Sequence, residues 1–216
     1  MIKVILFDLD GTLYKSSEIK DKFAEAAYHT LAKFKKISLA EAQTIVEERR
    51  AELKKKDGYS VPYTLTLVHY GVPIEYWHKE NIKFFDPRDY LTKDHNFKRC
   101  LLKLKKRYRL AILTNNNDTQ TERILEALGL HELFDEVFTY NSFKLLKPNV
   151  QFFKKAAQEL AVKPAECLVV GDRYSVDLNP AKRLGMQIYE VKGPDDIYSL
   201  EDILDIYYHS PLKINK

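Results

Sequence analysis

Five short apolar runs, each bounded by turn residues, constrain the fold of this 216-residue chain more than any other feature. Runs of four or five apolar residues are typical of strands buried on both faces of a parallel sheet. From the second run onward they alternate with segments of helical periodicity, and this order predicts an α/β fold with an open parallel sheet. The runs span residues 4–7, 110–114, 136–139, 167–171 and 187–191.

Helical patterns fill the connections between the later runs. Two of these helices are expected to end at Gly129 and Gly185, because glycine readily adopts the left-handed conformation that closes a helix. The sequence therefore predicts a Rossmann-like parallel sheet core with helices on both faces. The expected helices of this core span residues 96–108, 118–128, 149–160, 176–184 and 200–207.

The first connection departs from this order. An insert of roughly 70 residues lies between Asp8 and the next core helix, whereas such connections usually take about 2 to 6 residues. Its patterns are helical, over residues 18–35, 38–56, 63–69 and 74–84, and Ser38 and Glu41 have capping-box spacing. We therefore predict that residues 1–14 and 87–216 form the catalytic core and that residues 15–86 form a small α-helical cap inserted after the first strand.

Composition excludes several classes of protein. With 45% hydrophobic and 31% charged residues, the chain is neither disordered nor fibrous. The net charge of +4 is too small to indicate a nucleic-acid partner. Cys100 and Cys167 lie in apolar patterns and are expected to be free thiols. Because neither a signal peptide nor an apolar run of membrane length is apparent, we expect a cytoplasmic protein with no membrane partner.

Polar residues follow several of the apolar runs. An Asp-Gly pair after one run is by itself a common turn, Thr114 with the asparagines after it is by itself a common helix start, and Lys147 before Pro148 is equally ordinary. However, the carboxyl ends of parallel strands meet at one edge of a sheet. The residues expected to meet there are Asp8, Asp10, Thr114, Lys147, Asp172 and Asp177.

Four carboxylates at one edge would repel one another unless a cation lay between them. Oxygen ligands without nearby histidine or cysteine favour Mg²⁺ over zinc, and Mg²⁺ commonly shares a phosphate of the substrate. A nucleophile, a metal, a hydroxyl group and a lysine are the groups that phosphoryl transfer needs. We therefore expect this edge of the sheet to bind Mg²⁺ and a small phosphorylated substrate.

Four motifs, taken in chain order, resemble those of the haloacid dehalogenase superfamily. They are "DLDGT" with Asp8 and Asp10, "LTN" with Thr114 and Asn115, "LKP" with Lys147, and "GDRYSVD" with Asp172 and Asp177. The resemblance covers nearly the whole chain, and the insert resembles the C1-type cap of that family. It implies a phosphatase, that is, a phosphoric monoester hydrolase.

The resemblance also implies a role for each residue. Asp8 would attack phosphorus and form an aspartyl-phosphate, while Asp10 would protonate the leaving oxygen and later activate water. The remaining residues would bind: Thr114, Asn115 and Lys147 the phosphoryl oxygens, and Asp8, the Asp10 carbonyl, Asp172 and Asp177 the metal. Dehalogenases of the family lack an acid at the position of Asp10, which favours the phosphatase branch. Arg173 stands where small polar residues are frequent; it would face substrate or cap, or form a surface ion pair, which we favour.

The insert is expected to select the substrate. Its aromatic residues would stack on a nucleobase, form a lid, or pack as the core of the cap, and the core interpretation is favoured. They are Tyr59, Tyr63, Tyr70, Tyr76 and Trp77, within a stretch that faintly resembles pyrimidine 5′-nucleotidase-like members. His69 and His78 are candidates for a cap-borne acid or base, although packed or surface histidines are the favoured interpretation.

Two alternatives to a phosphatase acting on a nucleoside monophosphate or a sugar phosphate remain open. A phosphomutase of the same superfamily would return the phosphoryl group to its substrate. A receiver-like phospho-switch also uses aspartate, threonine, lysine and Mg²⁺, but its acids stand in a different chain order and it has no helical insert. Trapped phosphoprotein without phosphate release would favour these alternatives over hydrolysis.

Overall fold

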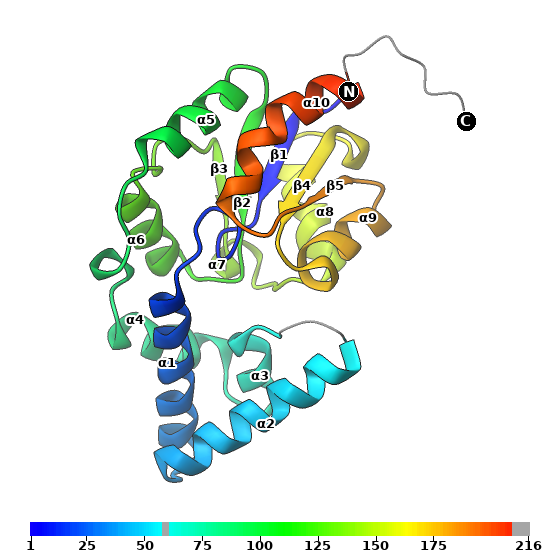
Figure 1. Cartoon of the computed structure of the whole chain (residues 1–216). Helices are drawn as coiled ribbons and strands as arrows, with labels where there is room; N and C mark the ends of the chain where they lie inside the picture. Colours follow the sequence, from blue (N-terminus) through cyan, green and yellow to red (C-terminus); the bar gives the residue numbers. More distant parts are fainter. Residues whose placement is uncertain (58–60, 209–216) are drawn as a thin grey trace. The chain divides into compact units, whose positions relative to one another are not determined.

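A computed structural model describes residues 1–57 and 61–208 of the chain, which divides into two units (Figure 1). The first unit comprises Met1–Lys15, Lys93–Thr114 and the chain from Leu128 onward. The second comprises Ser16–Thr92 and Asn115–Ala127. The predicted insert, residues 15–86, falls almost entirely in the second unit, but that unit also takes in a later segment of the chain.

A five-stranded parallel sheet forms the centre of the first unit, with the strand order β3-β2-β1-β4-β5. Its strands are β1 (Val4–Phe7), β2 (Arg109–Leu113), β3 (Glu136–Phe138), β4 (Cys167–Gly171) and β5 (Gln187–Glu190). β1 lies in the middle, with Phe7 paired to Ile112 of β2 and to Val170 of β4. The residues that follow β1, β2 and β4 therefore meet at one edge of the sheet, as the sequence predicts.

Burial along the strands follows their place in the sheet. Every residue of β1 and β4 is buried, whereas the edge strand β5 is partly exposed. Three strands end one residue earlier than predicted, so that Thr114, Thr139 and Val191 lie just beyond them. Thr139 instead caps a short helix that the sequence did not predict, by accepting a hydrogen bond from the backbone N–H of Asn141.

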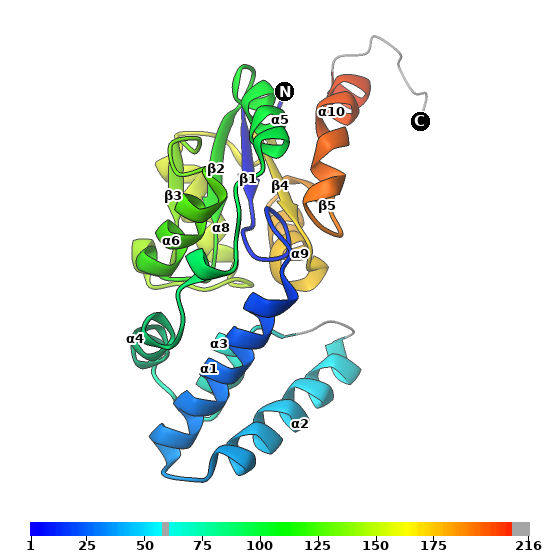
Figure 2. The same cartoon turned by 60° about the vertical axis from the view of Figure 1, so that its left-hand side comes forward.

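Helices lie on both faces of the sheet within this unit (Figure 2). The helices are α5 (His95–Lys105), α7 (Tyr140–Phe143), α8 (Val150–Glu159), α9 (Asn179–Arg183) and α10 (Leu200–Tyr208), with 3₁₀ turns at Pro164–Glu166 and Pro194–Ser199. On one face, Val4 and Leu6 of β1 share an apolar cluster with Phe152 of α8 and Ala181 of α9. On the other, Phe7 contacts the ring of Phe134 edge-on. The fold is thus the predicted α/β, Rossmann-like one.

The helix predicted over residues 176–184 is divided in the structure. Its first turn is a π-helical segment, Tyr174–Leu178, and α9 follows it. Pro180 lies in the first turn of α9, where proline is tolerated because its missing N–H has no partner to lose. Asp177 is consequently carried by the π-helical turn, a type of turn that is frequent at functional sites.

The second unit is helical. Its helices are α1 (Ser17–Lys35), α2 (Leu39–Asp57), α3 (Tyr63–His69), α4 (Ile74–Phe84) and most of α6 (Asp118–Leu128), with a 3₁₀ turn at Pro87–Asp89. Ser16 caps α1 by accepting from the backbone N–H of Ile19, and Ser38 accepts from that of Glu41. The Arg123 guanidinium of α6 donates to the carbonyl of Ile82 at 3.0 Å, which ties this later segment to the insert.

The aromatic residues of the insert pack as its core. Trp77 is 2% exposed and lies in an apolar cluster with alanine, leucine and valine residues of α1, α2 and α3. Tyr63, Tyr70 and Tyr76 are partly buried against the same cluster. Tyr59 lies outside the described residues. Of the two histidines, His78 is buried and His69 is exposed.

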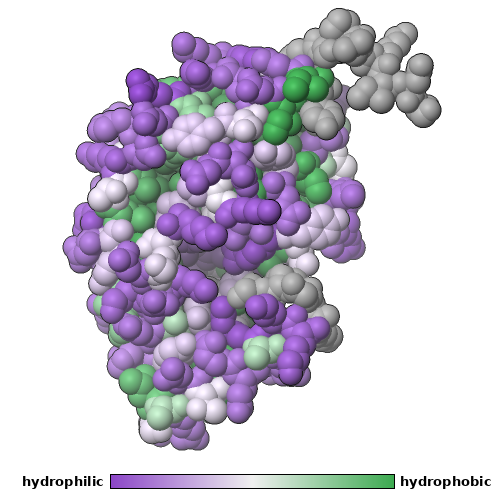
Figure 3. Space-filling view, in the orientation of Figure 1, coloured by the Kyte–Doolittle hydropathy of each residue, from purple (hydrophilic) through white to green (hydrophobic). Residues whose placement is uncertain are grey.

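The visible surface carries the charged composition of the chain. The face in Figure 3 is mostly hydrophilic, with apolar side chains gathered over α10, where Ile206 is 64% exposed. Within residues 1–57 and 61–208, every helix is too short or too polar to cross a membrane.

Candidate active site

Asp8, the candidate nucleophile, follows the central strand directly. Its backbone N–H bonds to the carbonyl of Val170 at 2.9 Å, which continues the pairing with β4 and fixes where the side chain emerges. The carboxylate is 2% exposed; its Oδ1 lies 2.5 Å from Lys147 Nζ, and its Oδ2 accepts from the Thr12 hydroxyl at 3.3 Å. Burial would raise the pKa of Asp8, but the charges of Lys147 and Arg173 outweigh it and hold the pKa below its usual value. Asp8 is therefore an ionised, buried carboxylate.

Lys147 joins two segments of the site that are far apart in the sequence. It precedes α8 in a loop with a cis Lys147–Pro148 bond, and it is 1% exposed. Its Nζ lies 2.5 Å from Asp8 Oδ1 and 2.6 Å from Asp177 Oδ1. Burial would lower the pKa of this amine, but the charges of Asp177 and Asp8 raise it. The lysine thus stays charged and forms ion pairs with two buried carboxylates.

Three carboxylates form a group that fits a divalent cation. One oxygen each from Asp8, Asp172 and Asp177 lies within 4.8 Å of the other two. The Oδ1 atom of Asp172 is buried and accepts no hydrogen bond from the described residues. Burial and the charge of Asp8 raise the pKa of Asp172 to about 7. An oxygen-only donor set suits Mg²⁺ better than zinc.

Two glycines make room for this group of carboxylates. A Cβ on Gly11 would lie 2.5 Å from Asp172 Oδ2, and a Cβ on Gly171 would lie 2.6 Å from the Cβ of Asp177. Gly11 also has a φ of +90°, which other residues adopt only with strain. Glycine at positions 11 and 171 therefore leaves the space that the side chains of Asp172 and Asp177 occupy.

Arg173 lies within the carboxylate group. Its guanidinium is 3.4 Å from Asp172 Oδ1, 3.5 Å from Asp177 Oδ2 and 3.7 Å from Asp8 Oδ2, and its side chain is 21% exposed. We expected Arg173 to form an ion pair at the surface. It does form ion pairs, but with the carboxylates of the site, so the expected location was wrong. The side chain lies there because the π-helical turn bends the chain back: the Arg173 backbone N–H donates to Asp177 Oδ2 at 3.1 Å.

Asp10 accepts a hydrogen bond from a tyrosine four residues further along the chain. The Tyr14 hydroxyl donates a hydrogen bond to Asp10 Oδ1. Burial, and next the charge of Asp8, raise the pKa of Asp10 to about 6. Burial and the neighbouring Asp10 raise the pKa of Tyr14 well above its ordinary value, so the phenol stays protonated. The two carboxylates of "DLDG" thus differ in environment, since the pKa of Asp8 is lowered and that of Asp10 is raised.

The remaining predicted residues lie at the end of β2. The backbone N–H of Thr114 bonds to the Phe138 carbonyl at 2.9 Å, and its side chain is 1% exposed. Since β2 is the neighbour of β1, the structure brings Thr114 to the same edge of the sheet as Asp8. Asn115 is 8% exposed and is the first residue of the later segment grouped with the helical unit.

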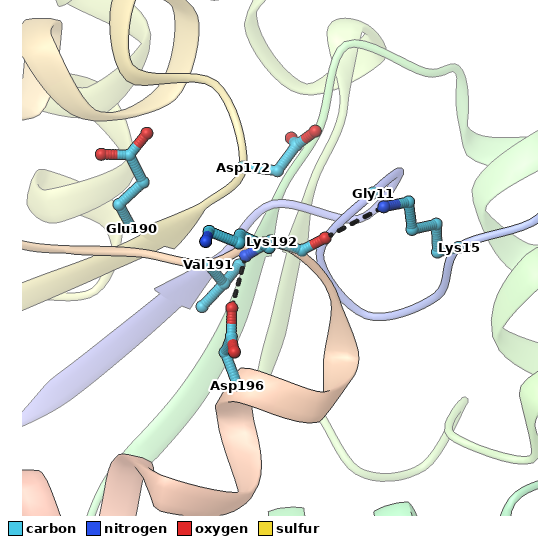
Figure 4. A pocket seen from close by; sticks show the side chains of 7 residues that line it. All are labelled: Gly11, Lys15, Asp172, Glu190, Val191, Lys192 and Asp196. Carbon is cyan, nitrogen blue, oxygen red and sulfur yellow. Dashed lines mark hydrogen bonds between the residues drawn. The ribbon is translucent and has the colours of Figure 1, made fainter.

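A pocket of about 500 Å³ borders this site on the side of β5 (Figure 4). It is lined by Gly11, Lys15, Asp172, Glu190, Val191, Lys192 and Asp196. Lys15 Nζ donates to the Lys192 carbonyl at 3.4 Å, and the Lys192 backbone N–H donates to Asp196 Oδ2 at 2.6 Å. Asp172 thereby faces a pocket within the first unit.

Two residues of the site were missed by sequence reasoning. Thr12 and Tyr14 contact the carboxylates of Asp8 and Asp10, each from a position four residues further along the chain. The available signal was the turn itself, because a Gly at position 11 reverses the chain and brings later residues back to the aspartates.

Comparison with known proteins agrees with this geometry. A family model described as haloacid dehalogenase-like hydrolase matches residues 2–185. The chain belongs to the haloacid dehalogenase-like hydrolases. A protein of Methanocaldococcus jannaschii named glyceraldehyde 3-phosphate phosphatase is 32% identical over 95% of this chain and 97% of its own length. With this relative, the family membership confirms the prediction of a phosphoric monoester hydrolase.

Solved structures agree on the fold of this haloacid dehalogenase-like hydrolase. A phosphatase of the family from Thermococcus onnurineus matches with a TM-score of 0.59 and 24% identity, covering 94% of this chain and 98% of that one. A 2-haloacid dehalogenase from Pseudomonas syringae matches with a TM-score of 0.61 and 20% identity, covering 96% and 100%. Since both kinds of enzyme share the fold, the choice between them rests on the site, where Asp10 and the three-carboxylate group are present.

Proposed function

We propose that this chain is a Mg²⁺-dependent phosphatase that hydrolyses a small phosphorylated metabolite through an aspartyl-phosphate on Asp8. The observation that carries the proposal is the buried contact of Asp8 with Lys147, next to carboxylates that suit a divalent cation. A carboxylate approaches an anionic phosphate only when nearby positive charge offsets the repulsion. Lys147 and Arg173 supply part of that charge.

In the first step, an oxygen of Asp8 bonds to phosphorus while the bond from phosphorus to the leaving oxygen breaks. Asp10 gives its proton to that leaving oxygen, which departs as an alcohol. In the second step, Asp10 takes a proton from water as the water oxygen bonds to phosphorus. The bond to Asp8 then breaks and inorganic phosphate is released. A raised pKa in Asp10 suits the first of these steps, because the acid must hold its proton before the transfer.

The binding residues follow from the same arrangement. Mg²⁺ would be held by Asp8, the backbone carbonyl of Asp10, Asp172 and Asp177, and when bound it would neutralise charge on the phosphoryl oxygens. Lys147, Thr114 and Asn115 would bind those oxygens as well. Residues 15–86 would act as a cap that selects the substrate, because the groups at the strand ends recognise only phosphate and metal.

A triose phosphate is the first substrate to test. The relatives from Methanocaldococcus jannaschii and Pyrococcus furiosus, both 32% identical, are named glyceraldehyde 3-phosphate phosphatase. Such a substrate is small and offers a primary phosphate ester, which an aspartate nucleophile can attack in line. We also propose a cytoplasmic location, which suits the two free cysteines, Cys100 and Cys167.

The test measures phosphate release from glyceraldehyde 3-phosphate, other sugar phosphates, nucleoside monophosphates and phosphoglycolate, with Mg²⁺ and with EDTA. We expect release to require Mg²⁺ and to fall by a factor on the order of 10⁴ or more in Asp8→Asn, because the amide is not a nucleophile. Asp195→Asn, in the 3₁₀ turn Pro194–Ser199, is the matched control and should retain activity. Full activity of Asp8→Asn, or in EDTA, would refute the proposal.

The same assay separates the alternatives. A phosphomutase would show transfer between positions on its substrate with little free phosphate. A receiver-like phospho-switch would take up phosphate on Asp8 from a small donor and release it slowly. The relatives named phosphatases make hydrolysis the preferred outcome.

A further inference from the structure

The loop after β1 folds back on itself so that Tyr14 returns to Asp10. The backbone N–H of Gly11 donates to the Tyr14 carbonyl at 3.0 Å, and that of Leu13 donates to the Leu9 carbonyl at the same distance. An isolated bridge pairs residues 10 and 14. The backbone alone therefore fixes which residue faces Asp10.

Packing holds the tyrosine in this place. The side chains of Leu9 and Leu13 are at most 1% exposed, and Tyr14 is 6% exposed. A buried phenol has few rotamers open to it, so its hydroxyl meets the carboxylate of Asp10 in a defined direction. The hydroxyl donates to one particular oxygen, Oδ1.

We propose that Tyr14 is a positioning residue that fixes the orientation of the Asp10 carboxyl group for proton transfer. The hydrogen bond from the Tyr14 hydroxyl to Oδ1 restricts the rotation of that carboxyl group, so Asp10 is held in one orientation toward the reacting oxygen. This inference rests on the proposed function, in which Asp10 is the acid and then the base. Neither the motif resemblance nor the comparisons assign a role to Tyr14.

The proton then moves along a defined route in both steps. In the first, the Asp10 carboxyl gives its proton to the leaving oxygen as the bond between that oxygen and phosphorus breaks and the bond from Asp8 forms. In the second, the Asp10 carboxylate accepts a proton from water as the water oxygen bonds to phosphorus and the bond to Asp8 breaks. Tyr14 keeps its own proton throughout and acts only through Asp10.

The experiment compares wild type with Tyr14→Phe on phosphate monoesters whose leaving groups differ in basicity. p-Nitrophenolate leaves without a proton at neutral pH, whereas an alkoxide needs one from the general acid. In Tyr14→Phe, we expect kcat/KM for alkyl phosphates to fall about tenfold or more, but kcat/KM for p-nitrophenyl phosphate to change less than about threefold. The second step is common to all substrates, so kcat for p-nitrophenyl phosphate should fall, with a burst of p-nitrophenol.

The comparison of substrates on one preparation removes the effect of partial unfolding, because misfolded protein lowers all rates by the same factor. Tyr198→Phe, an exposed tyrosine that packs on Phe97, is the matched control and should leave the ratio of the two substrates unchanged. An equal loss for both kinds of ester, or no loss for either, would overturn the role of Tyr14 and leave the proposed function intact. Hydrolysis of every ester by Asp8→Asn at the wild-type rate would instead overturn the proposed function, and the role of Tyr14 with it.

Discussion

The site at the strand ends and the core of the helical unit bury very different side chains. At the strand ends, Asp8, Asp177 and Lys147 are charged and at most 2% exposed. In the helical unit, the buried pair of Trp77 and Thr64 is neutral: Trp77 Nε1 donates to the Thr64 hydroxyl at 2.9 Å. The ion pairs of that unit lie at its surface, as in Lys33 with Glu80, whose lysine side chain is 61% exposed.

This difference indicates that the two regions bury polar groups for different reasons. Removing charges from water costs several kcal/mol for each ion, and the attraction between them seldom returns more than that cost. A core built for stability alone would bury apolar or neutral groups, as the helical unit does. We therefore infer that the charged group at the strand ends serves to bind a ligand, and we expect changes in the two regions to affect different measurements.

The largest effect is expected from Lys147→Met. Turnover should fall by a factor on the order of 10³, because the variant loses the cation that offsets charge between Asp8 and phosphate. The free energy of unfolding in EDTA should also fall by roughly 3 kcal/mol, since Asp8 and Asp177 lose a buried partner. Steady-state kinetics and urea unfolding check both numbers. Lys154→Met, at an exposed position of α8, is the control, and normal turnover in Lys147→Met would remove Lys147 from the site.

The next effect is on the pH dependence of stability without metal. The folded protein raises the pKa of Asp10 to about 6 and that of Asp172 to about 7, so between about pH 4 and 7 it holds protons that the unfolded chain has released. Stability in EDTA should therefore fall as the pH rises from 5 to 8, by roughly 1–3 kcal/mol. The lowered pKa of Asp8 acts only near pH 4 and below. Thermal unfolding at each pH measures the change in stability. Stability that does not vary with pH in the Asp10→Asn, Asp172→Asn double variant would assign the change to these two carboxyl groups.

Saturating Mg²⁺ sharpens the same test. A bound cation favours the ionised carboxylates, so the fall in stability between pH 5 and 8 should disappear or reverse. A profile that is identical with Mg²⁺ and with EDTA would contradict a metal site at these aspartates.

The ends of the strands could be predicted because they depend on residues that are close together in the sequence. Short apolar runs followed by polar turn residues define where each strand stops, and the parallel order then unites Asp8 with Lys147, 139 positions apart. Features that depend on tertiary contacts were harder to predict. The helix Asp118–Leu128 belongs mostly to the same unit as the insert, through contacts such as that of Arg123 with Ile82. The hydrophobic periodicity of the sequence gives no sign of such contacts.

Within the site, the same limit applied to Arg173 and Tyr14. A charged residue in a turn is usually solvated, and only the π-helical turn brings the Arg173 backbone to Asp177. A tyrosine after an apolar run usually packs, and only the closure of the loop at Gly11 aims its hydroxyl at Asp10. The spacing of the motifs predicts which residues lie close together. The local path of the backbone, in the π-helical turn and in the loop at Gly11, determines which of their atoms are in contact.

The helical unit offers the reverse experiment to Lys147→Met. Trp77→Phe removes the indole that bonds to Thr64 and leaves a smaller ring in the core. The free energy of unfolding should fall by about 1–2 kcal/mol, with turnover at a temperature where the variant is folded within about twofold of wild type. Thr64→Val, which removes the partner, should cost less. A large loss of turnover at full folding would show that the core of this unit also shapes the active site.

The smallest and most specific effect concerns Arg173. Its guanidinium lies 3.4 to 3.7 Å from three carboxylates that would bind Mg²⁺, so it opposes the cation while it stabilises the metal-free protein. Arg173→Ser should bind Mg²⁺ about tenfold more tightly, equivalent to about 1.4 kcal/mol, and should melt at a lower temperature in EDTA. Isothermal titration with Mg²⁺ and melting in EDTA measure the two changes separately. Arg173→Lys, which keeps the charge on a shorter and more flexible stem, should fall between wild type and serine. Weaker binding in Arg173→Ser would mean that the guanidinium holds the carboxylates in place for the metal, and the charged group at the strand ends would then have a structural role as well.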